Sequence, residues 1–553
     1  MPRHLFSSAL LIISLLICCG NSGASASDQR DAMDPFAGTT DIPAAAWEGV
    51  GDAAQSVTSL RVPSLVAVGE DVFAVAEAHC MKQDEGAGCV TGIASKRLEQ
   101  TAEGAAMEIS AADTRLLYTQ LVDGSDAAEK KAMNIMRPTT LVRGNEVYML
   151  LGRRTRTEPE ERDAGKTGWK LVLVKGSVSG DGDNGKKIVW TQTRAVDAAS
   201  IGFHGSLTAL SGGGGSGLVL GDGTLVFPMQ GINREKKSVL LALRLTPSGD
   251  KWTLSSDTTG AGCRDPSIVE WGEDGSLLAM APCERGSYDV YPSTPRGVAW
   301  YNAGEPISRV WGTSLNRQGG DGVQSGFVTA TFENKKVMLL TTPVYSEEEG
   351  KEKGRLHLWL TDNSRVHDVG PVSASGDDAA ASSLLYRSGA SEELILLYEK
   401  KKNGDSYGLV SLSLAKQLEQ IKSVVQTWKE MDAALQSCTS SAAVGTRING
   451  VCNGPVPTRG LVGLLSSTLA GTAWVDEYLG VNATVKGGAA TSEKGGVTFS
   501  GAGAGAEWPV GSRGQNQPYY FANNGFTLAA TVMIHTVPEA DTPLLGVRMN
   551  DTV

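Results

Sequence analysis

One pattern constrains the fold of this chain more than any other: an apolar run, a short polar turn and a second apolar run occur together six times. Turn residues between β-rich runs predict β-hairpins. The six copies are "LVAVGEDVFAVAEA" from Leu65, "TLVRGNEVYMLLG" from Thr140, "GLVLGDGTLVFPMQ" from Gly217, "IVEWGEDGSLLAMA" from Ile268, "TATFENKKVMLLTT" from Thr329 and "LLYRSGASEELILLYE" from Leu384. A hairpin unit that recurs every ~50–80 residues favours the blades of a β-propeller over an array of β-sandwiches.

The segments between the hairpins supply further strands. "KLVLVKGSV" and "RLHLWLTDN" have the same β-rich composition, and the 67 glycines of the chain suit many tight turns. We therefore expect an all-β fold with a six-bladed propeller across residues 57–413. The glycine run "SGGGGSG" from Ser211 is interpreted as a flexible turn.

After the sixth hairpin the hydrophobic period changes from two residues to three or four. The repeating apolar residues are Leu414, Leu418, Ile421, Val425, Trp428 and Leu435. This spacing predicts an amphipathic linking α-helix over residues 414–437. Strand patterns return in "GVTFSGAGAGAEWPV" and "GFTLAATVMIHTV", so we expect a second β domain over residues 438–553. Its few strands are too few for a complete β-sandwich, which predicts a truncated domain or a fragment.

The first residues have the pattern of a secretory signal peptide. Arg3 is followed by an apolar run over residues 10–19 and by the small residues Ala24-Ser25-Ala26. We expect residues 1–26 to be removed and residues 27–56 to form an N-terminal segment. The protein would enter the secretory pathway and reach the cell surface or the medium, with no lipid-anchor signal visible in the sequence.

Six cysteines follow the predicted signal peptide, and an even number in an exported chain indicates disulfides. They form three sequence-close couples: Cys80 with Cys89, Cys263 with Cys283, and Cys438 with Cys452. Pairing within these couples is a hypothesis, because the spacing alone leaves the connectivity open. Two sequons predict N-glycosylation at Asn482 and Asn550.

Charge and motif patterns exclude several other functions. The net charge of −11 argues against nucleic-acid binding, which requires a basic surface. No Cys-x-x-Cys motif occurs, and the histidines show no ligand spacing, so we expect no metal site and no cofactor.

Several stretches together resemble the trypanosome trans-sialidase superfamily, from about Val57 to the end of the chain. They are "SLRVPSL", "GCRDPSIVEW", "ISRVWGTS", "LHLWLTDNSRVHDVGPVS", "SSLLY", "IKSVVQTWKEMD" and "GQNQPYYFANNGFTLAATVMIHTVPEADTPLLG". The resemblance implies a sialidase-like propeller, a linking helix and a concanavalin A-like lectin β-sandwich, the last of which would be partial here.

The resemblance also implies where substrate-binding arginines would lie. A sialidase holds the substrate carboxylate with an arginine cluster, because guanidinium groups bind carboxylates through paired, charge-assisted bonds. Arg61 matches the first of these arginines, Pro282 occupies the place of the second, and Lys353 matches the third. Arg285 follows Pro282 by three residues and could replace the second arginine only if the backbone shifted.

The catalytic positions implied by the resemblance are also altered. Ala381 stands where the tyrosine nucleophile is expected, and Asp265 replaces the glutamate that supports it. Tyr386 lies five residues further on, an odd offset that places it on the other face of a strand. Glu85, or its neighbour Asp84, falls near the place of the acid/base. Arg137 replaces an aspartate expected beneath the sugar.

These losses predict that the chain has no useful hydrolase or transferase activity. It resembles the non-catalytic surface-glycoprotein branch of the superfamily, which implies adhesion to host-cell or extracellular-matrix glycoproteins, with sialoglycans as further partners. Two alternatives remain: a weak sialidase or trans-sialidase that uses Glu85 and another tyrosine, and a sialic-acid lectin that uses Arg61 and Lys353. In the favoured interpretation, Arg61 is a remnant paired to a neighbouring carboxylate.

Overall fold

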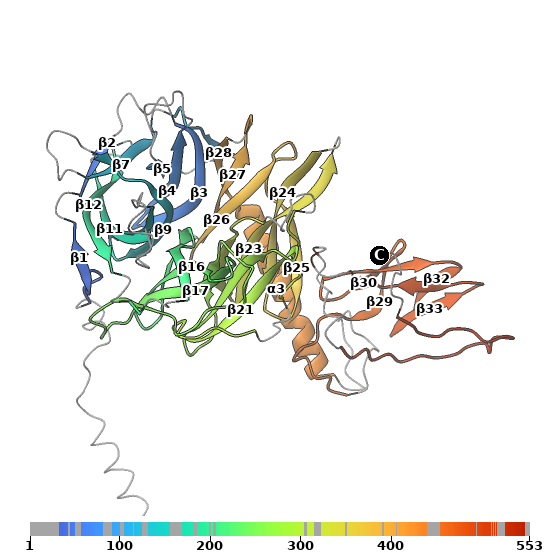
Figure 1. Ribbon diagram of the computed structural model, residues 1–553. Helices are drawn as coiled ribbons and strands as arrows, with labels where there is room; N and C mark the ends of the chain where they lie inside the picture. Colours follow the sequence, from blue (N-terminus) through green and yellow to red (C-terminus); the bar gives the residue numbers. More distant parts are fainter. Residues whose placement is uncertain are drawn as a thin grey trace, which may run out of the picture.

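The computed structural model describes residues 33–547 with gaps, the longest of which are 50–56, 81–90, 124–130, 155–168, 315–321, 439–453 and 517–525. Six antiparallel sheets follow one another along the chain and form a six-bladed β-propeller (Figure 1). The prediction of an all-β propeller followed by a linking helix and a lectin-like domain is therefore confirmed. The predicted signal peptide, Glu85, Asp84, Cys89, Cys452 and Asn550 lie outside the described residues.

Each of the six predicted hairpins lies in a different blade, and in all blades but the third it forms the first two strands. Blade 1 contains β3 (Val57–Val68), β4 (Asp71–Cys80), β5 (Gly92–Leu98) and β7 (Leu117–Asp123), with β8 (Lys131–Ala132) beside β7. Blade 2 contains β9 (Ile135–Arg143), β10 (Glu146–Arg154), β11 (Trp169–Ser179) and β12 (Lys187–Val196), with β14 (Gly215–Ser216) beside β9. Blade 3 contains β13 (Leu207–Gly212), β15 (Leu218–Val219), β16 (Leu225–Asn233), β17 (Ser238–Leu245) and β18 (Thr253–Leu254).

The remaining three blades follow the same order. Blade 4 contains β19 (Ser267–Glu270), β20 (Ser276–Cys283) and β21 (Ser287–Pro295). Blade 5 contains β22 (Gly326–Phe332), β23 (Lys335–Glu348), β24 (Lys351–Thr361) and β25 (Val366–Pro371). Blade 6 contains β26 (Ala379–Arg387), β27 (Glu393–Lys401) and β28 (Tyr407–Ser413), and its fourth strand is β6 (Met107–Ile109) from the beginning of the chain.

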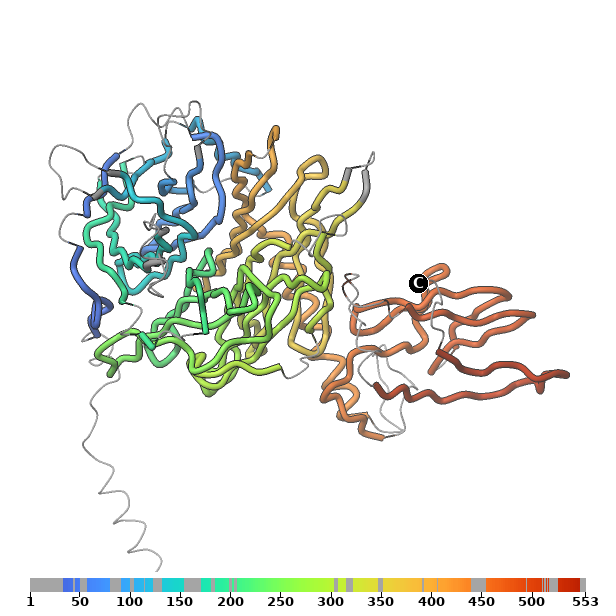
Figure 2. The backbone as a smooth tube through the Cα atoms, viewed as in Figure 1, coloured from blue at the N-terminus to red at the C-terminus, as the bar shows by residue number. Residues whose placement is uncertain are grey.

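The N-terminal segment before β3 also joins the propeller. Its strands β1 (Thr39–Asp41) and β2 (Ala45–Gly49) pair with the outer strands β12 and β7. Trp252 in blade 3 donates its indole N–H to the carbonyl of Pro35 at 2.8 Å. Figure 2 shows this first part of the chain running along the outer edge of the early blades. The segment is therefore an integral edge of the ring.

Small hydroxyl residues of neighbouring blades meet where the first strands converge. Ser64 of blade 1 lies 2.6 Å from the hydroxyl of Thr140 in blade 2, and both are buried. Ser267 of blade 4 donates to the carbonyl of Ser325 at 2.6 Å, and Ser382 of blade 6 accepts the N–H of Gly326 at 3.1 Å. Larger apolar side chains pack between the blades further out, so the ring is polar at its centre and apolar between its sheets.

The linking helix α3 (Ala415–Gln436) covers one side of blades 5 and 6. Its buried face consists of Leu418, Ile421, Val424, Val425, Trp428, Met431 and Leu435, which agrees with the predicted period. No helix in the described part of the chain is both long and apolar enough to span a membrane.

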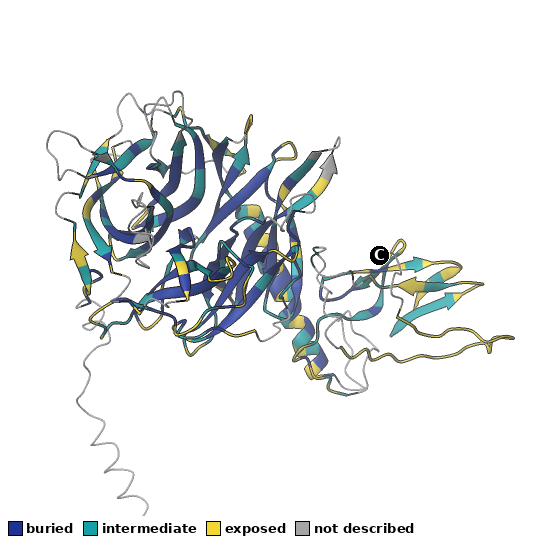
Figure 3. Ribbon diagram, in the orientation of Figure 1, coloured by how far each residue is buried: buried dark blue, intermediate teal, exposed yellow. Residues whose placement is uncertain are grey.

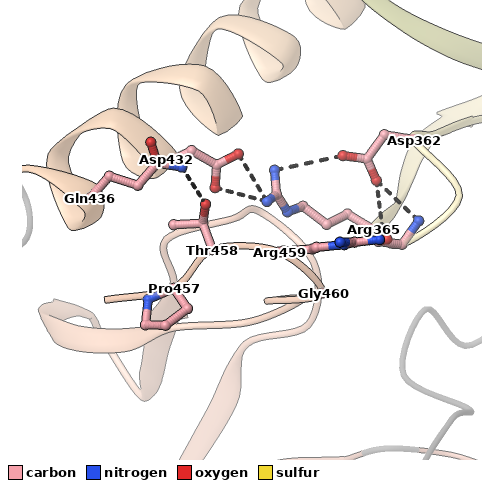
Figure 4. Close-up of a pocket in the computed structure, with 9 residues that line it drawn as sticks. Asp362, Arg365, Asp432, Gln436, Pro457, Thr458, Arg459 and Gly460 are labelled. Atoms are coloured by element: carbon pink, nitrogen blue, oxygen red, sulfur yellow. Dashed lines mark hydrogen bonds and ion pairs between the residues drawn. The ribbon is translucent and has the colours of Figure 1, made fainter. Parts of the chain in front are cut away.

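A buried arginine joins the propeller, the helix and the C-terminal sheets. Arg365 follows the β24–β25 turn, and its guanidinium lies between Asp362 and Asp432 of α3 (Figure 4). It binds both Asp432 oxygens at 2.8 and 3.0 Å, donates to the carbonyl of Leu461 at 2.9 Å, and lies 4.4 Å from the ring of Tyr478. One cation therefore holds three parts of the chain together.

The C-terminal region forms two small sheets beyond the helix. They contain β29 (Leu465–Ala470), β30 (Ala473–Asp476), β31 (Ala483–Lys486) and β34 (Gly505–Glu507), and β32 (Ala489–Glu493) with β33 (Gly496–Ser500). The expectation of a paired strand in "GFTLAATVMIHTV" is wrong: residues 526–535 are exposed and pair with no described residue. Figure 3 shows this exposed stretch next to the C-terminal sheets.

We expect Arg365→Met to lower the free energy of unfolding of the C-terminal region by about 2–4 kcal/mol. The substitution leaves Asp432 without its cation and the Leu461 carbonyl without its donor. Hydrogen exchange measured by mass spectrometry should become faster in β29 and β30 and remain unchanged in blades 1–3.

A matched control is Lys429→Ala, which also removes a cation that joins α3 to the propeller. Lys429 binds Glu333 at 2.8 Å, but both side chains are exposed, so the change should cost less than about 0.5 kcal/mol. Equal effects of the two substitutions would contradict the role of Arg365.

Candidate functional site

The candidate site lies where the first strands of blades 1, 2 and 4 begin, and we call it the axial site. It contains Arg61, Arg137 and Asp265 and the side chains that contact them. Three of its residues, Val62, Arg137 and Asp265, have φ values of 53°, 54° and 53°. Each precedes a proline, and positive φ costs a residue other than glycine about 1–3 kcal/mol. Other contacts must therefore stabilise this backbone.

Each of the three left-handed residues donates its backbone N–H to a side-chain oxygen of the preceding blade. The pairs are Val62 N to Glu399 Oε1 (2.7 Å), Arg137 N to Glu77 Oε2 (2.7 Å) and Asp265 N to Gln230 Oε1 (2.9 Å). The acceptors lie on the second strands of blades 6, 1 and 3. We refer to these three bonds as the blade clamps. They direct the residues of the axial site toward a common region.

Arg61 pairs with a buried carboxylate, as predicted. Its Nε lies 3.2 Å from Glu399 Oε2, and its guanidinium carbon lies 4.1 Å from the centre of the Tyr407 ring. The Arg61 side chain remains 39% exposed, whereas that of Glu399 is 1% exposed. One part of the guanidinium is therefore anchored, and the rest faces solvent.

Complete burial raises the pKa of Glu399 above its usual range. The Arg61 cation and the backbone N–H groups of Val62 and Ala381 oppose this rise without cancelling it. Burial is the largest influence on Arg61 and acts to lower its pKa, but Glu399, Tyr407 and Glu77 together outweigh it, so that this pKa is raised. Arg61 thus keeps its charge. The protonation of Glu399 depends on its ion pair with Arg61, because the cation opposes the rise in the pKa of this carboxyl.

Arg137 crosses the axial site and binds Asp265. Its Nη2 lies 2.6 Å from Asp265 Oδ1, and its Nε donates to the carbonyl of Gly212 at 3.1 Å. The same Nη2 donates to the carbonyl of Gly213. The carboxylate expected to support a nucleophile is therefore already paired with a cation.

The glycine run of residues 212–215 is part of the axial site, so its interpretation as a flexible turn is wrong. Gly214 has a φ of 82°, and a Cβ atom there would meet Val62 Cγ1 at 2.5 Å and Arg137 Nη2 at 3.3 Å. Only glycine allows the backbone to approach the arginine this closely.

The other positions implied by the resemblance can now be placed. Pro282 is buried in β20, and its carbonyl accepts the N–H of Arg264, the neighbour of Asp265. Ala381 is buried in β26 beside Glu399. Tyr386 donates to Glu392 at 3.1 Å and packs edge-on against Phe332, so it stabilises the hairpin. Lys353 lies in β24 opposite Ser346 and is partly buried.

Cysteines and the glycosylation positions are described only in part. Cys263 and Cys283 form a disulfide, and Cys438 is disulfide-bonded. The group spaced for a metal ion in the described chain consists of Cys263, Cys283 and Asp289, and the disulfide leaves it without thiolate ligands. Asn482 is exposed, and its Oδ1 accepts the N–H of Asp476.

Sequence reasoning missed the acceptors of the blade clamps. Glu77, Gln230 and Glu399 each lie at the end of an apolar strand, in "VFAVAE", "LVFPMQ" and "LILLYE". A polar residue at the same place in three hairpins was a visible signal, because a buried carboxylate or amide requires a partner.

A six-bladed propeller with an arginine-containing axial site and a lectin-like C-terminal region defines the sialidase-like class of proteins. Residues 62–399 match the family model of the BNR repeat-like domain, and residues 457–553 match the trans-sialidase C-terminal domain. The chain belongs to the trypanosome trans-sialidase superfamily.

Two kinds of relatives support this assignment. Sialidase 85-1.1 of Trypanosoma cruzi is 30% identical over 507 residues, which cover 88% of this chain and 63% of that protein. The solved Trypanosoma rangeli sialidase is 32% identical with a TM-score of 0.66, over 84% of this chain and 71% of the solved one. The same sialidase in complex with sialic acid gives a TM-score of 0.67 at 30% identity, over 88% of this chain and 76% of that one.

The Glu399 carboxyl predicts a pH dependence of stability. Because its folded pKa is raised, the native protein keeps a proton that the unfolded chain has lost at pH values above about 4.5. The free energy of unfolding should therefore fall, relative to that of Glu399→Gln, as pH rises from about 4.5 through the raised pKa. Guanidinium unfolding at pH 5 and pH 7 measures the difference.

Arg61→Ala provides the complementary measurement. It leaves Glu399 buried without its cation and should lower the free energy of unfolding by about 2–3 kcal/mol at pH 7, and by less at pH 5, where a larger share of this carboxyl is protonated. Arg115→Ala removes an exposed arginine paired with Glu99 and should change stability by less than about 0.5 kcal/mol at either pH. Equal losses for Arg61→Ala at both pH values would refute the raised pKa.

Proposed function

We propose that this chain is a catalytically inactive member of the superfamily that acts as a surface or secreted glycoprotein in adhesion. The observation that supports the proposal is the Arg137–Asp265 ion pair, taken together with Ala381 at the position where the resemblance implies a nucleophile. It combines the loss of a nucleophile with the neutralisation of the carboxylate that would support one.

The missing groups remove the covalent route to glycoside cleavage. A sialidase forms a bond between a tyrosine oxygen and the sugar, and the methyl group of Ala381 cannot make this bond. General acid/base catalysis contributes about 10²–10⁴-fold to the reaction rate. The carboxyl group of Glu85 could supply that contribution but would not replace the nucleophile. Pro282 also lacks the guanidinium that would hold a substrate carboxylate.

The proposed ligands are host-cell or extracellular-matrix glycoproteins, including those that carry sialic acid. Trypanosoma rangeli sialidase was solved in complex with sialic acid, and part of the Arg61 guanidinium in this chain still faces solvent. We assign residues 1–26 to a signal peptide, 57–413 to the propeller, 414–437 to the linking helix and 438–553 to the lectin-like domain.

A fluorogenic sialoside tests the catalytic part of the proposal. We expect no turnover by the purified chain above the rate of the buffer, with Trypanosoma rangeli sialidase as the positive control. Turnover that Glu85→Ala abolishes would overturn the proposal and favour the weak-sialidase alternative.

Binding to cultured mammalian cells tests adhesion separately. Fluorescent beads coated with the chain should bind cells more than beads coated with the same chain after heat denaturation. Pretreatment of the cells with a bacterial sialidase then separates sialoglycan ligands from other glycoproteins. Binding no greater than that of the denatured control would refute adhesion.

A further inference from the structure

Blade 4 contains a polar cavity of about 490 Å³ outside the axial site. The residues that line it are Gly260, Ala261, Gly262, Cys263, Cys283, Glu284, Arg285, Asp289, Val290, Tyr291, Asn302, Ser308 and Arg309. Its volume lies within the range of ligand pockets, ~300–1,000 Å³. Its lining is unusual for a surface depression, because it combines two guanidinium groups, two carboxylates, an amide and a phenol.

The wall of this blade-4 cavity is held in place by covalent and polar contacts. The Cys263–Cys283 disulfide joins the loop before blade 4 to the end of β20. The Tyr291 hydroxyl lies 3.1 Å from Cys263 Sγ, and Ser308 accepts the N–H of Val290 at 3.3 Å. The polar groups therefore keep a defined arrangement without a ligand, which lowers the entropic cost of binding one.

The charges of the cavity leave one cation available. Lys237 pairs with Glu284, and Arg309 Nε binds Asp289 Oδ1 at 3.3 Å. Arg285 is exposed and has no ion-pair partner among the described residues. The net charge of these groups is therefore positive, and the excess charge is carried by a guanidinium that can bind an anion with two parallel hydrogen bonds.

The remaining groups suit a sugar. The paired carboxylates of Glu284 and Asp289 can accept hydrogen bonds from hydroxyl groups, and the Asn302 amide can donate and accept. Tyr301, next to Asn302 in the chain, is an aromatic residue that is 49% exposed. A plain inorganic anion would use only Arg285 and would leave these groups unused.

We propose that the blade-4 cavity binds an acidic saccharide, with Arg285 on its carboxylate or sulfate group. This inference deepens the proposed adhesive function and rests on it. It assigns anion recognition to a place beside the axial site, since Pro282 lacks a guanidinium and the chain carries Arg285 three residues further along. The structure directs Arg285 into this cavity and leaves the axial arginine position without a cation.

Isothermal titration calorimetry on the full chain tests the inference with four probes: 3′-sialyllactose, a heparin-derived hexasaccharide, neutral lactose and inorganic sulfate. One or both acidic saccharides should bind, and lactose and sulfate should bind at least about tenfold more weakly. The two acidic probes show whether the recognised group belongs to a sialic acid or to a sulfated, uronic-acid-containing chain.

Arg285→Ala should weaken binding of the acidic saccharide at least about tenfold, and Arg285→Lys should restore part of it, because lysine keeps the charge but not the paired donors. Arg459→Ala removes another exposed arginine, beside α3, and should leave affinity within about twofold, which controls for net charge. The melting temperature should be unchanged in all three variants.

Two results would overturn the inference: no binding of either acidic saccharide, or equal binding by the Arg285→Ala variant. The first would leave the proposed function standing if beads coated with the chain still bind cells. Binding of sulfate as tight as that of the saccharides would refute recognition of the sugar.

Discussion

The blade clamp is the interaction on which the geometry of the axial site depends. Three chain segments enter their blades through a left-handed residue before a proline, a conformation that is unfavourable by itself. A side-chain oxygen from the preceding blade accepts each of the three N–H groups, and two of the acceptors, Glu77 and Glu399, are buried. Because every clamp spans a blade boundary, the local backbone and the packing of the ring stabilise each other.

The clamps also explain how the site could change its chemistry without losing its shape. Arg61, Arg137 and Asp265 stand on or next to clamped residues, so their directions are set by backbone bonds that do not depend on side-chain identity. Arg137 can therefore occupy the place expected for an acid and bind Asp265 while the blades keep their arrangement. A pocket of this kind tolerates substitution of its functional groups as long as its buried acceptors remain.

Much of the fold could be predicted from local patterns, because a hairpin and an amphipathic helix are encoded by residues that lie close in sequence. All six hairpins and the apolar face of α3 were visible in this way. The Arg137–Asp265 pair, the partners of the three acceptors and the pairing of β6 with β28 were not, because each joins different segments of the chain. Local sequence also predicted a strand that does not form, at residues 526–535. The composition of this stretch is that of a strand, but a paired strand also requires a neighbouring strand, which local sequence cannot reveal.

The pairing of β6 with β28 has a consequence for how the molecule is made. Glu108 of β6 also binds Lys400 of β27, which lies 292 residues further along the chain. The ring therefore cannot close until nearly all of the propeller has left the ribosome. Until then, β6 has no β28 to pair with. Closure over such a long loop is slow compared with hairpin formation, so the open ring exposes strand edges during synthesis.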